Sequence, residues 1–205
     1  MDKAAYVLVG IVLGAVLGAL KDLWFQSRAA KKGREYLAVR VSCLLDAFAG
    51  QCAEVVADDG LCMGQYDSTG RRTPQVQVPK FDPLGLDVDW ASLPAALMDD
   101  VLSIPNRVDA ANQGIEAAFT YAASPPDYEE GFEERQYQYA KLGLKAYEVA
   151  SRLRGIANLQ DQPPGSLDWN PADFMSRRLT DIEAHREMGL ERRAGLMEAT
   201  KVTAV

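Results

Sequence analysis

The residues best suited to chemistry are the glutamates of one short acidic segment, Glu129, Glu130, Glu133 and Glu134. In a helix, Glu129 lies one turn from Glu133, and Glu130 lies one turn from Glu134. Two carboxylates at this spacing can bind a divalent cation or act as an acid and base pair. The segment is therefore the candidate for a metal-dependent or acid–base site.

Other residues do not complete such a site. Helical di-metal sites usually add Glu-x-x-His pairs, and the chain has none; its only histidine is His185, which we expect to form a solvated ion pair with Asp181. Glutamates also stabilise the first turn of ordinary helices through the helix dipole. GxxxxGK[ST], GxGxxG and GxSxG motifs are absent from the sequence. We therefore favour the structural interpretation of the glutamates and assign no metal, no cofactor and no catalytic residue.

A second pattern concerns association rather than catalysis. Gly10, Gly14 and Gly18 recur every fourth residue within 17 uncharged residues, numbers 4–20, that lie between Lys3 and Lys21. The apolar character returns at residues 23–25, which brings the run close to the length that spans a bilayer. The pattern predicts a single transmembrane helix over residues 1–26. Glycines on one side of it would let a second helix approach closely, although glycine is also simply common in membrane helices.

Basic residues follow the apolar run and give it a direction. We call them the basic collar: Lys21, Arg28, Lys31, Lys32 and Arg34. The positive-inside rule then predicts a single-pass protein of the cell membrane, with its N-terminus outside and its C-terminal domain in the cytoplasm. In that arrangement the collar faces anionic lipid head groups.

Two alternatives to a retained anchor stay open. One is a signal peptide cleaved near Ala29, which would make the chain an exported helical domain, but Leu20, Lys21 and Asp22 suit a cleavage site badly. The other is a buried helix of a soluble protein, for which such a uniformly apolar terminal run would need a large covering surface.

Charge and cysteine content restrict the expected binding partners and the expected compartment. Residues 1–40 hold seven Lys or Arg and three Asp or Glu, whereas residues 41–205 hold 15 basic and 26 acidic side chains. The acidic part repels phosphate, so nucleic acid is not expected as a partner. Cys43, Cys52 and Cys62 form no CxxC pair and are expected to be free thiols, which agrees with a reducing compartment; Cys43 and Cys52 are expected to be buried.

Apolar periodicity predicts a mainly α fold. Residues 27–158 are expected to form a small helical bundle, residues 159–170 a linker, and residues 171–205 an amphipathic C-terminal helix with a tail. The expected apolar faces run through the following residues: Leu37, Val41, Leu44, Phe48 and Val55; Leu97, Met98, Val101 and Leu102; Val108, Ala111, Ile115 and Phe119; Phe132, Tyr139, Leu142, Ala146, Val149 and Leu153; Phe174, Met175, Leu179, Ile182 and Leu190.

One segment of the bundle breaks the helical pattern. Residues 61–90 contain a turn cluster from Asp67 to Gly70, and Val76 and Val78 alternate with glutamines. The pattern predicts a short β-hairpin insertion followed by a surface loop. A flexible loop is the alternative, because an isolated hairpin is marginally stable.

These features predict a membrane-anchored protein-interaction or scaffold protein. Its expected partners are membrane lipids and either another protein or further copies of itself. The alternative is a membrane-bound enzyme that uses the acidic segment, possibly with a metal ion.

Overall fold

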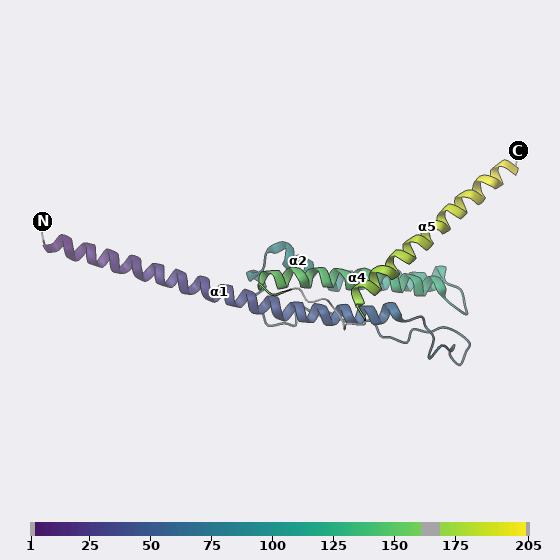
Figure 1. Ribbon diagram of the computed structural model, residues 1–205, viewed down its shortest axis with the longest axis horizontal. Coiled ribbons are helices and arrows are strands. Elements are labelled where there is room, and N and C mark those ends of the chain that lie inside the picture. The colour runs from purple at the N-terminus through teal and green to yellow at the C-terminus, as the bar shows by residue number, and fades with distance from the viewer. Residues whose placement is uncertain (1–2, 161–168, 204–205) are drawn as a thin grey trace.

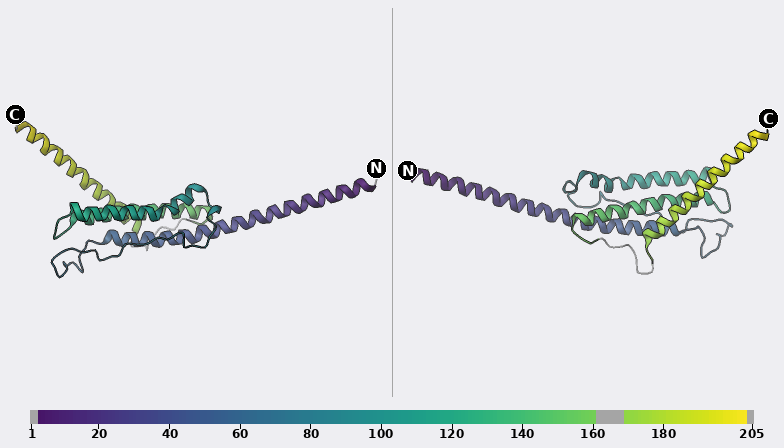
Figure 2. Two further views of the ribbon diagram at one scale, coloured as in Figure 1. Left: turned by 180° about the vertical axis from the view of Figure 1, so that it is seen from behind. Right: turned by 45° about the horizontal axis from the view of Figure 1, so that its top comes forward.

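The computed structural model describes the backbone of residues 3–160 and 169–203, and the side-chain surroundings of most residues between 13 and 192. The first element, α1 (Lys3–Ala57), is a single helix of 55 residues. Its second half lies in the body of the molecule, and its first half extends away from that body (Figure 1). Figure 2 shows the same extension from two further directions. The expected N-terminal helix and the first helix of the expected bundle are therefore parts of one continuous helix.

The body is a helical bundle built around α1 and α4. A one-turn helix, η1 (Trp90–Ser92), leads into α2 (Ala95–Leu102) and α3 (Ile104–Ala117), which continues as a π-helical turn, η2 (Ala118–Ala122). After Pro125 and Pro126, α4 (Glu129–Ile156) runs beside α1. Finally, α5 (Pro171–Thr203) crosses α4 and then leaves the body on the side opposite the N-terminus (Figure 1).

The core contains most positions of the apolar faces predicted from periodicity. Tyr139, which is fully buried, donates a hydrogen bond from its hydroxyl to Asn112 Oδ1 at 2.7 Å, so its polar end is satisfied inside the bundle. Among the expected positions, those that are buried are Leu37, Val41, Phe48, Val55, Leu97, Val101, Val108, Ala111, Ile115, Phe132, Tyr139, Leu142, Ala146, Val149, Leu153, Met175 and Ile182. Leu44 and Leu190 are exposed instead.

Gly143 allows α1, α4 and α5 to approach each other. A Cβ atom at this position would lie 2.6 Å from the Met175 sulfur and 2.9 Å from the Cys52 Cβ. Such distances are shorter than van der Waals contact, so no larger residue fits without moving a helix. Cys52 is buried as expected, whereas Cys43 and Cys62 are exposed, and all three are free.

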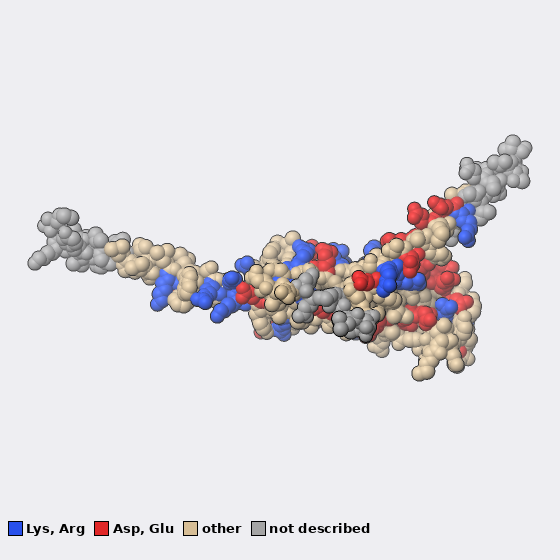
Figure 3. All heavy atoms as spheres, in the orientation of Figure 1, with Lys and Arg blue, Asp and Glu red and all other residues tan. Residues whose placement is uncertain are grey.

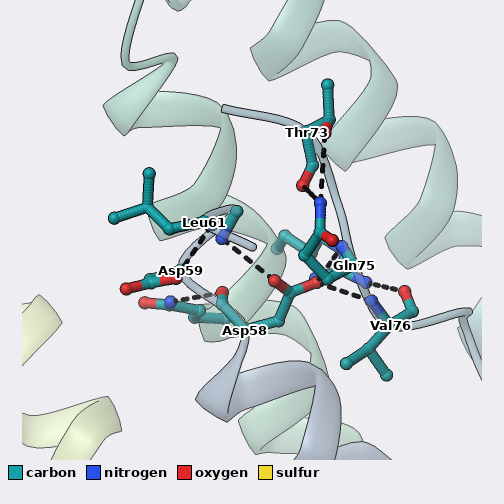
Figure 4. A network of polar contacts seen from close by, with 9 residues as sticks. Asp58, Asp59, Leu61, Thr73, Gln75 and Val76 are labelled. Carbon is teal, nitrogen blue, oxygen red and sulfur yellow. Dashed lines mark hydrogen bonds and ion pairs between the residues drawn. The ribbon is translucent and has the colours of Figure 1, made fainter. Parts of the chain in front are cut away.

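A buried ion pair closes the end of α1. Asp58 accepts a hydrogen bond from the Arg135 guanidinium at 2.8 Å, and both side chains are at most 3% exposed. The same carboxylate accepts backbone N–H bonds from Gly60, Gln75 and Val76 (Figure 4). Asp58 thus ties the chain leaving α1 both to α4 and to the segment that returns along the body.

The predicted β-hairpin is wrong. Residues 61–90 contain no strand, and their only ladder-type contact is an isolated bridge between Cys62 and Gln65. The backbone N–H groups of Gln75 and Val76, which a hairpin needs, are bound by Asp58 instead. The segment is an ordered loop with local turn hydrogen bonds, and its longer-range backbone bonds go to the end of α1 and to Pro126.

The predicted transmembrane helix, and with it the single-pass cell-membrane location, is also wrong. Within residues 3–160 and 169–203, no helix has both the length and the apolar composition that crossing a membrane requires. In α1, residues 4–20 lie between Lys3 and Lys21 and include three glycines, and Asp22 and Arg28 follow. The apolar stretch is shorter than the roughly 20 residues that a bilayer requires.

The start of α5 agrees with the predicted boundary at residue 171. Asn170 caps this helix, because its Oδ1 accepts backbone N–H bonds from Ala172 and Asp173. At α4 the residue before the helix is Tyr128, which adopts a left-handed conformation and makes no capping side-chain bond. Most of the expected linker, residues 161–168, lies outside the described residues.

We expect Arg135→Ala to lower the free energy of unfolding by roughly 3–5 kcal/mol, because Asp58 would stay buried without its cationic partner. Urea denaturation followed by circular dichroism at pH 7 measures this loss. The control is Arg152→Ala, whose guanidinium contacts Asp100 at the surface and whose loss should cost less than about 1 kcal/mol. Equal losses in the two variants would contradict a special role for the buried pair.

The same pair predicts a pH dependence. Burial raises the pKa of Asp58, but the N–H donors of Val76 and Gly60 and the charge of Arg135 outweigh it, so the pKa lies below its usual value. The contribution to stability is complete above the unfolded pKa of about 3.9 and is lost as the pH falls through the lower folded pKa. Asp58→Asn should therefore flatten the acid limb of the stability curve.

Gly143→Ala should destabilise the fold by roughly 1–3 kcal/mol, because the added methyl group meets Met175 and Cys52 at less than contact distance. The matched control is Gly155→Ala in the same helix, where nothing lies within 4 Å of the added atom. That change should be neutral or stabilising by up to about 1 kcal/mol. Thermal unfolding of both variants measures the difference, and a destabilised control would show that helix geometry rather than packing is responsible.

Candidate functional site

The free part of α1, which we call the arm (residues 3–36), carries an exposed apolar face. Its described members lie within an arc of about 120° at 100° per residue, and between 50% and 65% of each side chain is exposed. They are Leu13, Val16, Leu17, Leu20, Leu23 and Trp24. We call this set the leucine seam. Because at least half of each residue is exposed, no other described part of the molecule covers the seam.

The seam continues the face of α1 that packs in the core. Steps of three and four residues lead from Leu13 through Leu17, Leu20 and Trp24 to Ser27, Lys31 and Arg34. The same steps then reach the buried residues Ala38, Val41, Leu45, Phe48, Cys52 and Val55. One helix thus has a single apolar face, interrupted by Ser27, Lys31 and Arg34. The body covers the second half of this face and leaves the first half open.

The predicted glycine strip lies beside this seam. Gly14 and Gly18 are about 100° and 140° around the helix from Leu13, and no atom lies within 4 Å of a Cβ built at either position. Gly10 falls outside the residues whose surroundings are described. Association through the glycines stays a prediction, because the structure brings no second helix to them.

The basic collar lies on the arm between the seam and the body. Figure 3 shows its cations where α1 leaves the body, while acidic side chains gather toward α5. Arg28 lies over the Trp24 ring at 5.1 Å from its centroid, and Lys31 is 3.8 Å from Glu35. The collar is therefore a solvent-exposed charge next to an apolar face. Its predicted contact with lipid stays untested.

The acidic segment is divided between two roles. Glu129 and Glu130 are exposed in the first turn of α4, where carboxylates complement the helix dipole. Glu133 and Glu134 instead bind α5. Arg186 donates from Nε to Glu133 at 2.8 Å and from Nη2 to Glu134 at 2.8 Å. The four glutamates are thus not brought together as one site.

We call the contacts of Arg186 with Glu133 and Glu134 the clamp. Further polar contacts between α4 and α5 extend it. His185 Nδ1 lies 2.9 Å from Glu133 Oε2, so the predicted partner Asp181 is replaced by a residue of another helix. The Arg186 guanidinium also lies 4.4 Å from the centroid of the Tyr137 ring. About two turns earlier in α5, Arg178 donates two hydrogen bonds to Gln136 Oε1. No sequence pattern predicts these pairs, which join residues more than 40 positions apart.

The clamp determines the electrostatics of the acidic segment. Burial raises the pKa of Glu133, but hydrogen bonds and attraction from Arg186 and His185 outweigh it and hold the pKa below its usual value. Conversely, burial lowers the pKa of Arg186, but the hydrogen bonds and negative charges of Glu133 and Glu134 outweigh this effect, so the pKa lies above its usual value. The Glu133 carboxylate is thus held ionised, and both carboxylates are paired with a cation, which suits helix docking better than proton transfer near neutral pH.

A groove of about 520 Å³ lies beside the clamp and is lined by Glu130, Glu133, His185, Arg186, Gly189, Leu190 and Arg192. Among the residues that the structure describes, no group of three or more His, Cys, Asp or Glu side chains is placed to hold a metal ion. The arrangement therefore gives no support to the metal-dependent hypothesis.

Among the described residues of α5, burial against the body is found in its first half. Met175 and Ile182 are buried there, whereas Met188 and Leu190 are exposed beyond the clamp.

Comparisons with protein-family models, with curated proteins and with solved structures found nothing similar to this chain. The candidate site therefore rests on geometry. Its main feature, the leucine seam, was not predicted from the sequence, because the apolar residues of the arm were interpreted as a membrane helix. The regular steps of three and four residues from Leu13 to Val55 are the signal that could have revealed it.

We expect Arg186→Gln to loosen α5 near the clamp, because its guanidinium holds both Glu133 and Glu134. Amide hydrogen exchange of residues 183–192 should become roughly fivefold faster, as expected for a partly exposed interaction of about 1 kcal/mol. The control is Arg177→Gln, since Arg177 bonds only the carbonyl of Asp173 within its own helix. Equal exchange in the two variants would contradict the clamp.

Proposed function

We propose that the chain is a protein-interaction or scaffold protein that docks another helix on the leucine seam of its arm. The observation that carries the proposal is the continuity of α1: the face that α4 covers from Ala38 to Val55 is left uncovered from Leu13 to Trp24. A partner helix would cover the apolar face of the arm, as α4 covers the apolar face of the second half of α1.

The energetics favour such a partner. Each leucine buried from full exposure contributes roughly 1.5–3 kcal/mol, and the seam presents Leu13, Leu17, Leu20 and Leu23 together. Water-exposed apolar faces of this extent usually mark interaction sites. Residues spaced by three and four are also the pattern that packs as knobs into holes between two helices.

The basic collar restricts which helices fit. Lys31 and Arg34 lie on the same face as the seam and follow it toward the body. A partner helix must therefore be apolar along the seam and must place no cation against the collar, since like charges brought close together repel. The clamp supplies no observation in favour of the enzyme hypothesis.

A photo-reactive benzoyl-phenylalanine placed on the arm of the full chain tests the proposal. At Val16 or Leu20, on the seam, irradiation in the native cells should yield discrete adducts with a protein. At Asp22 or Gln26, which lie about 160° and 120° around the helix from the centre of the seam, the yield should be at least tenfold lower. Gel electrophoresis and mass spectrometry of the adducts measure the difference.

The substitutions Leu20→Glu and Gln26→Glu provide the matched control. The first places a charge in the seam and should abolish the adducts formed at Val16, whereas the second leaves them unchanged. The proposal is wrong if no protein adduct forms at the seam, or if both faces of the arm give the same adducts.

A further inference from the structure

We infer that the helix that covers the leucine seam is the same arm of a second copy of this chain, paired in antiparallel orientation. This inference rests on the proposed function and names the partner. It uses three observations: the position of the seam within the arm, the position of the collar, and the distance from both to the body.

A parallel pair would bring like charges together. The steps of three and four residues that define the seam continue to Lys31 and Arg34, so a parallel partner would place each of these cations against its own copy. Cations at such central positions are poorly tolerated in paired helices. In addition, both acidic bodies would lie side by side at one end of the pair.

An antiparallel pair reduces this repulsion. The seam runs from Leu13 to Trp24, so its centre lies between residues 18 and 19, and residue i of one copy faces residue 37 minus i of the other. At 1.5 Å per residue, the two copies of Lys31 are then about 38 Å apart, several times the Debye length of about 8 Å at physiological ionic strength. Collar positions 28–33 face residues 4–9, none of which is charged, whereas Arg34 faces Lys3 at the ends of the overlap. The antiparallel pair thus separates the two copies of Lys31 and keeps one cation opposite Arg34 at each end.

The length of the arm fits the same arrangement. The body begins where Leu37 becomes buried, at 1% exposure, whereas Tyr36 is still 61% exposed. The centre of the seam therefore lies about 18 residues before the body. Two arms can cover each other's seam with one body at each end of the pair. The two copies of Leu37 would be separated by about 55 Å along the pair, so the bodies do not collide.

Cysteine pairing distinguishes the orientations. The full chain is prepared with the exposed Cys43 and Cys62 replaced by serine, while Cys52 stays, since burial raises the pKa of its thiol and keeps it unreactive. One preparation carries Leu13→Cys and the other, with a tag of different size, carries Trp24→Cys. Each preparation and their mixture are oxidised and compared on non-reducing gels.

The antiparallel pair predicts a disulfide only in the mixture, because position 13 of one copy faces position 24 of the other. Two copies of position 13 would be about 17 Å apart along the axis, too far for a disulfide, which needs Cα atoms within about 7 Å. A parallel pair predicts the reverse: each preparation forms its own disulfide and the mixture adds no mixed product. That result, or a dimer that forms neither disulfide, overturns the inference.

Sedimentation of the native chain measures the association itself. Leu17→Ala with Leu20→Ala should weaken dimerisation by at least about 100-fold, since each dimer loses four leucine side chains. Gln26→Ala, outside the seam, should leave it unchanged. Thermal unfolding of the body should be the same in all variants, because no seam residue contacts it.

Failure of the inference and failure of the proposed function give different results. A chain that stays monomeric at micromolar concentration, but whose seam forms photo-adducts with a different protein, overturns the inference and leaves the proposed function standing. A monomeric chain without any protein adduct overturns both.

Discussion

The Asp58–Arg135 ion pair is the contact on which the rest of the body depends. Asp58 is the first residue after α1, and its carboxylate binds Arg135 of α4 together with the backbone of the returning loop. Gln136, the next residue of α4, donates to the Asp58 carbonyl oxygen. A charge buried this deeply is tolerated only when every hydrogen bond is made. The pair therefore determines how α1 and α4 lie against each other and where the loop must run.

The two ends of the molecule differ in how their apolar surface is covered. At one end, α4 offers Glu133, Glu134 and Tyr137 to α5, and a small residue, Gly143, lets α5 reach the core. At the other end, α1 continues beyond the start of the body, and no described element of the chain follows it. The molecule is thus asymmetric in how its apolar surface is covered, and the uncovered part is concentrated on the arm.

The arm also explains why sequence reasoning failed there. A run of apolar residues with regular glycines fits both a membrane helix and an exposed helix that pairs with another. Composition alone favoured the first, but the charges at Lys3, Lys21 and Asp22 leave too short an apolar stretch. The hairpin failed for another reason: the alternation around Val76 was real, but a carboxylate distant in sequence took the N–H groups that a strand partner would have used.

The sequence by itself determined the mainly α class and most of the buried faces, because an apolar residue every three or four positions must face a core whatever the helix packs against. It also located the start of α5 at Asn170, since capping is a local interaction. Only the tertiary structure decided that Glu133 and Glu134 serve to dock α5, that His185 pairs with Glu133, and that α1 is one helix with half of its face uncovered. These features depend on contacts between residues far apart in the chain, which no local pattern of residue types specifies.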